Sequence, residues 1–241
     1  MKSKVFYHGP SVIDGAKIVG VITYDSKNSK TGTGLAQTWI MRADMAPNTA
    51  QKTGHDESVC GNCRLRPSLF TPKALGEKEC YVITFHAPRS VLAAFQRGSY
   101  GPVVERENLP ELARGWNVRL GSYGNPSAIP SGIWESLMAE ASGWTGYDHL
   151  WNHPNPAVRA NSKALQRWCM ASVDSEESAR AAWADGWRTF RTMVPGSPMI
   201  DGECRCPASK EAGHLTTCDK CQACSGLLGR GHSSIAIDFH P

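Results

Sequence analysis

The chain is organised around the sequence CDKCQACSG at residues 218–226, which follows an earlier cysteine at Cys206. Eleven residues separate Cys206 from Cys218, and two residues separate Cys218 from Cys221 and Cys221 from Cys224. A compact turn with this spacing aims three sulfurs at one polynuclear centre, and Cys206 then supplies a fourth thiolate. The spacing therefore favours an iron-sulfur cluster, and we expect the [4Fe–4S] type.

Zinc is the first alternative at this stretch. Zinc sites more often use two separated Cys-x2-Cys pairs than a single Cys-x2-Cys-x2-Cys run such as this one. A disulfide framework is the least favoured, because the chain has nine cysteines, an odd number, and its first nine residues lack the apolar segment of a signal peptide. Cys204 lies two residues before Cys206 and is an additional candidate ligand.

A second group of cysteines precedes an apolar run in the first half of the chain. Two residues separate Cys60 from Cys63, and sixteen residues separate Cys63 from Cys80. The surrounding stretch 43–80 is polar and has no regular spacing of apolar residues. A loop of this length in a compact domain usually has a function, and holding a metal is one. Three cysteines predict either a fourth protein ligand or an iron left open for SAM or a small substrate. The candidates for the fourth ligand are Cys204, Cys169 and His55. A structural zinc knuckle or unligated buried thiols are the alternatives.

Length and charge place broad bounds on the function. The 241 residues suit one large α/β domain, and 26 Lys and Arg against 22 Asp and Glu give a net charge of +4. This net positive charge is far smaller than that of a dedicated nucleic-acid-binding protein, which carries a stripe of basic residues. No run of eighteen apolar residues occurs, so we expect a cytoplasmic protein without a membrane partner.

Periodicity and turn residues predict alternating strands and helices. We expect strands at residues 4–8, 17–24, 37–42, 81–85, 116–121, 146–151, 167–173, 187–194 and 233–239. We expect helices at residues 88–97, 110–114, 131–141, 156–165 and 174–185. Residues 26–34 are predicted to form a flexible turn rather than a phosphate loop, because Lys30 precedes the glycines. The succession predicts parallel strands with helices outside, in a barrel or an open sheet, within a single domain over 1–241. Its parts are the N-terminal strands with the first cysteine loop (1–80), the β/α repeats (81–200), and the C-terminal cysteine loop with the last strand (201–241).

In such sheets the binding and catalytic residues usually lie at the carboxyl ends of the strands. That rule selects the residues after three predicted strands, which are Ser122, Tyr123, Gly124, Asn125, His153, Asp174 and Ser175. Each also has a structural interpretation, since the glycine suits a turn and Asp174 or Ser175 suits a helix N-cap. No catalytic residue is assigned.

Several stretches together resemble a known group of proteins. They are DESVCGNC at 56–63, CYV at 80–82, RLGSYGNP at 119–126, MASVDS at 170–175 and the final cysteines. From about residue 17 to the end, the chain resembles a family of uncharacterised phage-encoded proteins, which are similar to radical SAM enzymes in their partial (β/α) barrel. The resemblance implies a phage protein in the host cell, with virion association left open, and the same barrel. It also implies cluster-binding cysteines at Cys60, Cys63, Cys80, Cys206, Cys218, Cys221 and Cys224. The radical SAM signature Cys-x3-Cys-x2-Cys is absent, which puts SAM cleavage in doubt.

Two functions follow from these patterns. The first is a redox or radical enzyme, in which the first cluster lies at the mouth of the barrel. The second cluster then relays electrons or closes that mouth. The substrate is an unknown small molecule or, by association with phages, a modified nucleotide or tRNA. The second is a non-catalytic, metal-braced module that binds nucleic acid or a protein. Its support is the cations Arg64, Arg66, Lys210, Lys220 and Arg230, together with eight tryptophans. The spacing of Trp134, Trp168, Trp183 and Trp187 predicts core packing instead.

Overall fold

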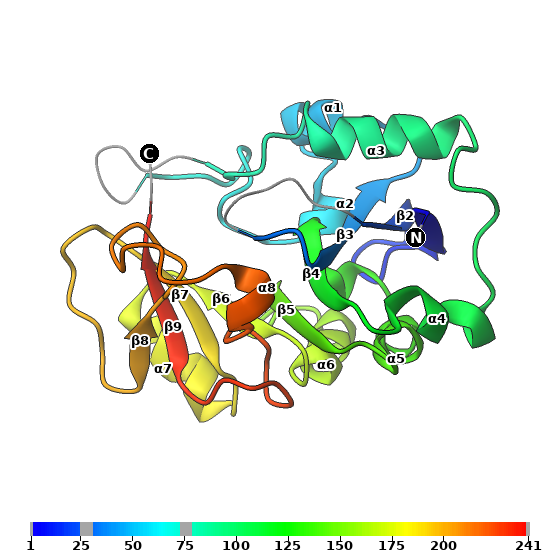
Figure 1. Cartoon of the computed structure of the whole chain (residues 1–241). Helices are drawn as coiled ribbons and strands as arrows, with labels where there is room; N and C mark the ends of the chain where they lie inside the picture. The colour runs from blue at the N-terminus through cyan, green and yellow to red at the C-terminus, as the bar shows by residue number, and fades with distance from the viewer. Residues whose placement is uncertain (1, 25–30, 73–78, 240–241) are drawn as a thin grey trace.

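The computed structural model describes residues 2–24, 31–72 and 79–239, which form a nine-stranded, mostly parallel sheet with helices (Figure 1). The strand order is β1-β2-β3-β4-β5-β6-β7-β9-β8. The protein is therefore a mixed α/β protein, as its alternation of strand and helix patterns predicts. The predicted turn at 26–34 falls largely outside the described residues.

The first three strands form an antiparallel meander. They are β1 (Lys4–Pro10), β2 (Lys17–Thr23) and β3 (Leu35–Arg42), as predicted to within a few residues. In β2 five consecutive residues are buried, which explains its unbroken apolar run. The outer edge of β1 is covered by a bridge between Val5 and Val103.

The remaining strands are parallel and step across the sheet almost in chain order. They are β4 (Asn117–Tyr123), β5 (Gly143–Asp148), β6 (Met170–Val173), β7 (Thr189–Met193), β8 (Glu203–Arg205) and β9 (Ser234–Asp238). Only β8 and β9 exchange places, with β8 at the edge. Among the described residues β8 does not pair with β1, so the sheet is open.

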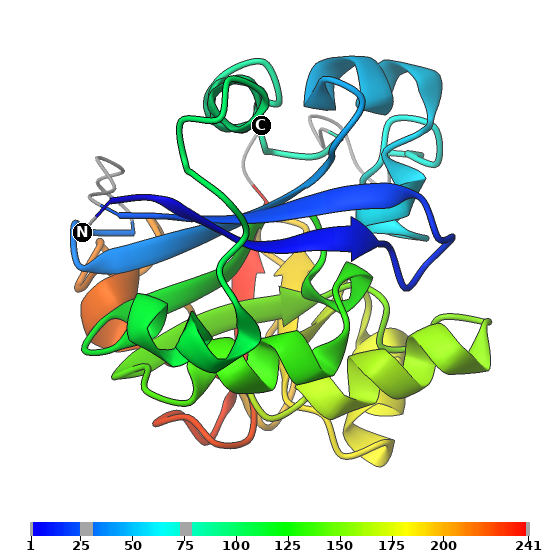
Figure 2. The same cartoon turned by 90° about the vertical axis from the view of Figure 1, so that its right-hand side faces the viewer.

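Helices cover both faces of this sheet (Figure 2). One face carries α1 (Pro47–Thr53), α2 (Glu57–Cys60) and α3 (Ala87–Gln96). The opposite face carries α4 (Leu109–Ala113), α5 (Ser131–Met138), α6 (Pro156–Leu165) and α7 (Glu176–Ala184). The short helix α8 (Cys218–Cys221) and the 3-10 turns η1 (Arg106–Asn108) and η2 (Pro126–Ala128) complete the elements.

The main core lies between the sheet and helices α4 and α5. Val118 and Leu120 of β4 pack there with Trp134, which is fully buried and donates its indole N–H to the carbonyl oxygen of Pro126 at 2.9 Å. Trp168 and Trp187 are also buried, and Trp183 is half-buried against the same cluster as Trp187, so core packing is confirmed for Trp134, Trp168 and Trp187 and only in part for Trp183.

Several predicted boundaries are wrong. The helix expected at 131–141 ends at Met138, the strand expected at 146–151 occupies Gly143–Asp148, and β8 has no predicted counterpart. The stretch 43–80, expected to be a loop, contains α1 and α2.

The largest error is the strand predicted at 81–85. This segment is irregular, and Tyr81, Ile83 and Phe85 are 70%, 53% and 60% exposed. Residues 81–85 lie between β3 and β4 in the chain, but these two strands pair directly with each other, so no strand is inserted between them. An extended pattern without a neighbouring strand cannot satisfy its backbone groups by pairing.

Candidate functional site

The first cysteine group lies at the carboxyl ends of the parallel strands. The backbone N–H of Asn125, just after β4, donates to the carbonyl oxygen of Val59 at 2.6 Å. Cys80 returns to the same loop because its N–H donates to the carbonyl oxygen of Leu65 at 2.8 Å. Cys60, Cys63 and Cys80 are therefore held together at the end of the sheet where α/β proteins place their sites.

Two features hold the Cys60–Cys63 turn in place. Gly61 has a φ of +57°, and a Cβ atom there would lie 2.4 Å from a methyl group of Leu150, so no larger residue fits. Beneath the turn, the buried guanidinium of Arg66 pairs with Asp56 at 2.9 Å and donates to the carbonyl oxygens of Gly54 and Gly61, each at 2.7 Å. The turn is thus fixed both by packing and by a buried charge pair.

His149, one residue beyond β5, faces the first cysteine group. Its Nδ1 atom lies 3.5 Å from the Sγ atom of Cys63. Its backbone N–H donates to the side-chain oxygen of Asn125 at 2.8 Å, and Asn125 in turn donates to the buried carboxylate of Asp148. The position of this histidine is therefore set by a chain of buried hydrogen bonds.

The three thiols differ in acidity. Burial raises the pKa of Cys60 well above its ordinary value, and the charges of Cys63 and Cys80 raise it further. Burial also raises the pKa of Cys80 to about 11. Burial acts in the same direction on Cys63, but the charge and hydrogen bond of His149 outweigh it and lower the pKa of Cys63. Conversely, the Cys63 thiolate raises the pKa of His149 against the effect of burial.

We expect iodoacetamide to alkylate Cys63 before Cys60 and Cys80 at pH 7, in protein treated with a chelator. The thiolate is the reacting form, and only Cys63 has a lowered pKa. The preference should shrink as the pH approaches about 11, where Cys80 ionises. Mass spectrometry of the labelled peptides measures the order. Equal rates for the three thiols at pH 7 would contradict the pairing with His149, and His149→Ala should abolish the preference.

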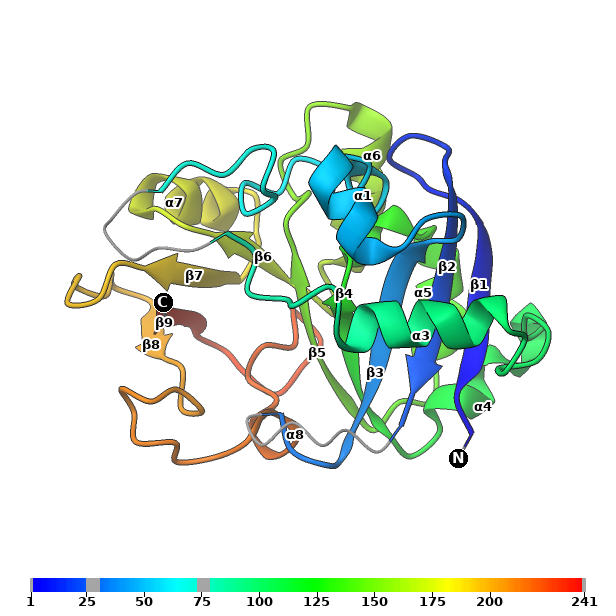
Figure 3. The ribbon, with the colours of Figure 1, turned by 90° about the horizontal axis from the view of Figure 1, so that it is seen from above.

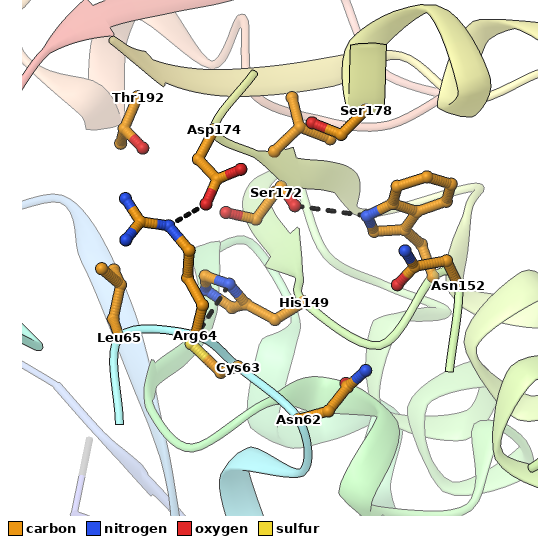
Figure 4. Close-up of a pocket in the computed structure, with 12 residues that line it drawn as sticks. Asn62, Cys63, Arg64, Leu65, His149, Asn152, Ser172, Asp174, Ser178 and Thr192 are labelled. Carbon is orange, nitrogen blue, oxygen red and sulfur yellow. Dashed lines mark hydrogen bonds and ion pairs between the residues drawn. The ribbon is translucent and has the colours of Figure 1, made fainter. Parts of the chain in front are cut away.

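A pocket of about 230 Å³ opens beside Cys63 and His149 (Figure 4). Its lining is mostly polar and includes Asn62, Arg64, Asn152, Ser172, Asp174 and Thr192. Asp174 forms an ion pair with Arg64 inside the pocket. The N-cap of α7 is Ser175, whose hydroxyl accepts the N–H of Ser178 at 3.1 Å, so Asp174 is not the capping residue. The pocket can hold a small polar molecule through hydrogen bonds.

The α8 part of the second cysteine group lies toward the amino-terminal ends of the strands, whereas Cys206 directly follows β8. The segment 224–228 is inserted beside the first half of β5: the N–H of Gly146 donates to the carbonyl oxygen of Cys224 at 2.9 Å. The indole N–H of Trp144 donates to the carbonyl oxygen of Ser225 at 2.7 Å. Figure 3 shows α8 near the start of β3 and α1 beyond its end. The helix α8 therefore lies on the side of the sheet where β3 begins.

Four sulfurs gather in this second group. Burial raises the pKa of Cys224 strongly, and the charges of Cys206, Cys218 and Cys221 raise it further. The charge of Cys221 also raises the pKa of Cys204, after burial. Gly226 has a φ of +63°, and a Cβ atom there would lie 2.5 Å from the carbonyl oxygen of Gln166, so the close approach requires glycine.

Polar side chains connect the two cysteine groups across the sheet. The guanidinium of Arg119 on β4 lies 5.8 Å from the ring centre of Tyr147 on β5, and its charge acts to lower the pKa of Tyr81, next to Cys80. Tyr147 in turn acts to lower the pKa of Cys224. Arg119 also stabilises thiolates at Cys218 and Cys224 by its charge. Arg119 and Tyr147 therefore interact electrostatically with residues of both groups.

The donor chemistry of both groups fits a metal centre, with one restriction. Thiolates crowded in a buried region repel one another, as the raised pKa values show, and a bound cation removes that repulsion. Within residues 2–24, 31–72 and 79–239, however, no three His, Cys, Asp or Glu side chains are arranged to hold a single metal ion. A cluster accepts more widely spaced sulfurs than one ion does, because each sulfur binds a different iron.

Two of the three candidates for the fourth ligand of the first group, Cys204 and Cys169, have other neighbours. Cys204 belongs to the second group, and the thiol of Cys169 is buried beside Gly146. His55 contacts the hydroxyl of Thr53 at 2.8 Å. Among the residues predicted at strand ends, the Nδ1 atom of His153 accepts a turn hydrogen bond from the backbone N–H of Asn155, and its carbonyl oxygen accepts one from Arg159. The neighbouring His149 was missed because the predicted strand, 146–151, ran through it.

The geometry defines an α/β protein with two cysteine groups on one mostly parallel sheet. Comparison of the chain with models of known protein families, with curated proteins and with solved structures found no match. Among the described residues, no helix has the length and apolar character needed to cross a membrane.

Proposed function

We propose that this protein binds an iron-sulfur cluster through Cys60, Cys63 and Cys80 and carries out redox chemistry beside it. The observation that carries the proposal is the convergence of these three thiols at the carboxyl ends of the parallel strands, next to a polar pocket. Binding sites of α/β proteins are usually found at this end. When bound, the cluster would supply single-electron transfer. The pocket residues would bind and orient a small polar substrate.

The stepwise order of β3 to β7 supports the partial (β/α) barrel of the proposal. In a barrel each strand lies beside its predecessor, and the order of these strands follows that rule. The phage origin and the likeness to radical SAM enzymes remain predictions from the sequence, and SAM stays open as a ligand of the pocket.

The second cysteine group would hold a further cluster that relays electrons. Cys206, Cys218, Cys221 and Cys224 would be its ligands, with Cys204 as an additional donor. Support comes from Arg119 and Tyr147, which interact electrostatically with residues of both groups. The charge of Arg119 would also offset the negative charge of thiolate-ligated clusters.

The alternative is a non-catalytic module braced by zinc or by iron-sulfur clusters, which binds nucleic acid or a protein. Exposed Lys210, Lys220 and Arg230 near the second group favour it. Two of the cations predicted to support it do not: Arg64 and Arg66 form ion pairs with Asp174 and Asp56. The burial of Trp134, Trp168 and Trp187 also removes these rings from base stacking.

Analysis of iron, acid-labile sulfide and zinc in protein purified without oxygen tests the proposal. We expect about eight irons and eight sulfides per chain, with a broad absorption band near 400 nm. Replacing Cys60, Cys63 and Cys80 together with serine should remove about half of the iron, and replacing Cys218, Cys221 and Cys224 together should remove the other half.

Cys169→Ser is the control, because its thiol belongs to neither group, and it should leave the metal content unchanged. Zinc without sulfide or colour would contradict the redox proposal and favour the structural module. An iron content that the first triple variant does not alter would contradict the assignment of the first cluster.

A further inference from the structure

Four parts of the chain build the pocket beside Cys63 and His149 (Figure 4). They are the turn 62–65, the loop after β5 at 149–152, the end of β6 at 172–174 with Ser178 of α7, and Thr192 near the end of β7. The strands β5, β6 and β7 are parallel neighbours, so their carboxyl ends meet here. Open parallel sheets usually bind their ligands at this end.

The pocket presents one basic and one acidic side chain that touch each other. Of the described residues that line it, Arg64 is the only Lys or Arg and Asp174 the only Asp or Glu. Their ion pair joins the Nε atom of Arg64 to one carboxylate oxygen of Asp174, and the two side chains are 26% and 22% exposed. A guanidinium has five N–H donors and a carboxylate two acceptor oxygens, so one such contact does not exhaust the bonding capacity of either group.

Further polar side chains line the same pocket. They are Asn62, Asn152, Ser172 and Thr192. Within residues 2–24, 31–72 and 79–239, these four side chains form no hydrogen bond with the protein. Their amide and hydroxyl groups can therefore donate to and accept from a bound molecule. Leu65 and Val173 add an apolar portion to the lining.

We propose that this pocket binds a small α-amino acid as a zwitterion, with the ligand carboxylate on Arg64 and the ligand ammonium on Asp174. An ion of one sign would be attracted by one of these side chains and repelled by the other, whereas a zwitterion is attracted by both. A single carbon atom joins the two charges of an α-amino acid, which suits side chains that are themselves in contact.

The size of the pocket points to a small member of this class. Its volume of about 230 Å³ is below the range of roughly 300–1,000 Å³ that is usual for drug-sized ligands. Leu65 and Val173 would contact a short aliphatic side chain. As the identity of the substrate, this inference rests on the proposed function, but binding in the pocket does not itself require a cluster.

Equilibrium dialysis of the whole chain, purified without oxygen, against ¹⁴C-labelled L-alanine at low salt tests the proposal. We expect saturable binding of about one molecule per chain. Propionate lacks the ammonium group and ethylamine lacks the carboxylate, so each should compete at least about ten-fold more weakly than unlabelled L-alanine. Competition by either analogue as strong as that of L-alanine would show a site for one charge alone and overturn the proposal. Absence of saturable binding would also overturn it.

Two variants separate the two charges. Asp174→Asn should weaken binding of L-alanine at least about ten-fold and remove its advantage over propionate, and Arg64→Gln should remove its advantage over ethylamine. Asp44→Asn is the matched control, because Asp44 also pairs with an arginine, Arg42, but does not line this pocket. It should bind L-alanine like the wild type. An equal loss in Asp44→Asn would assign the effect to net charge and overturn the proposal.

Iron and sulfide analysis of the same samples separates the possible failures. Protein with the expected iron and sulfide that does not bind L-alanine would overturn this inference alone. Protein without iron or sulfide that binds L-alanine, with the expected preference over both analogues, would support the site and overturn the proposed redox function.

Discussion

Replacing Arg66 with methionine is expected to lower the free energy of unfolding by about 3–5 kcal/mol. The side chains of Arg66 and Asp56 are only 6% and 4% exposed, so the substitution leaves a buried carboxylate without its cation. It also removes the donors that the guanidinium supplies to the carbonyl oxygens of Gly54 and Gly61. Methionine fills a similar volume, which limits any contribution from an empty cavity. Chemical denaturation followed by circular dichroism measures the loss.

The matched control is Arg114→Met. Arg114 also pairs with a carboxylate, that of Glu140, but the two side chains are 61% and 41% exposed. An exposed pair contributes little to stability because water screens it, so this variant should be nearly as stable as the wild type. Similar losses for the two arginine variants would show that burial of the Arg66 pair is not what matters. Because Arg66 lies under the Cys60–Cys63 turn, its loss should also reduce metal binding at the first group while sparing the second.

The second large effect is expected from Asp148→Ala, which should lower the free energy of unfolding by about 3 kcal/mol or more. Each buried hydrogen-bond donor that is left without an acceptor costs about 1–3 kcal/mol. The carboxylate of Asp148 is fully buried and accepts hydrogen bonds from four groups. They are the side chains of Asn125, Ser127 and Ser162 and the backbone N–H of Leu150.

Asp148→Asn should be milder, since the amide keeps one acceptor oxygen and the two serine hydroxyls can rotate to accept its N–H groups. Glu135→Ala removes an exposed carboxylate on the same face of the sheet and should change stability by no more than about 0.5 kcal/mol. The imidazole NMR signals of His149 should shift in Asp148→Ala and stay in place in Glu135→Ala. Wild-type stability of Asp148→Ala would contradict the network that positions His149.

Local patterns in the chain predicted the helices α6 and α7 well. The helix expected at 156–165 has those bounds, and the start expected near Asp174 and Ser175 is a capping box formed by Ser175 and Ser178. Both signals depend on residues within one or two turns, namely apolar spacing and an N-cap side chain. The same holds for the strands β1 to β3, whose apolar runs are bounded by turn residues.

Predictions that needed a neighbouring strand were less successful. Tyr81, Ile83 and Phe85 have the alternation of a strand, but they are exposed because no strand edge is available to them. Glu203–Arg205 forms a strand of three residues at the sheet edge, too short for periodicity to identify. Strand formation depends on a partner that sequence spacing alone does not locate.

By itself, the sequence determined the α/β class and the two groups of cysteines, because periodicity, caps and Cys-x2-Cys spacing act over a few residues. Only the tertiary structure decided which distant side chains meet: His149 with Cys63, and Arg119 with Tyr147. The physical reason is that strand order and crossover paths bring together residues far apart in the chain, and the packing and hydrogen bonds that select those paths involve the whole sheet.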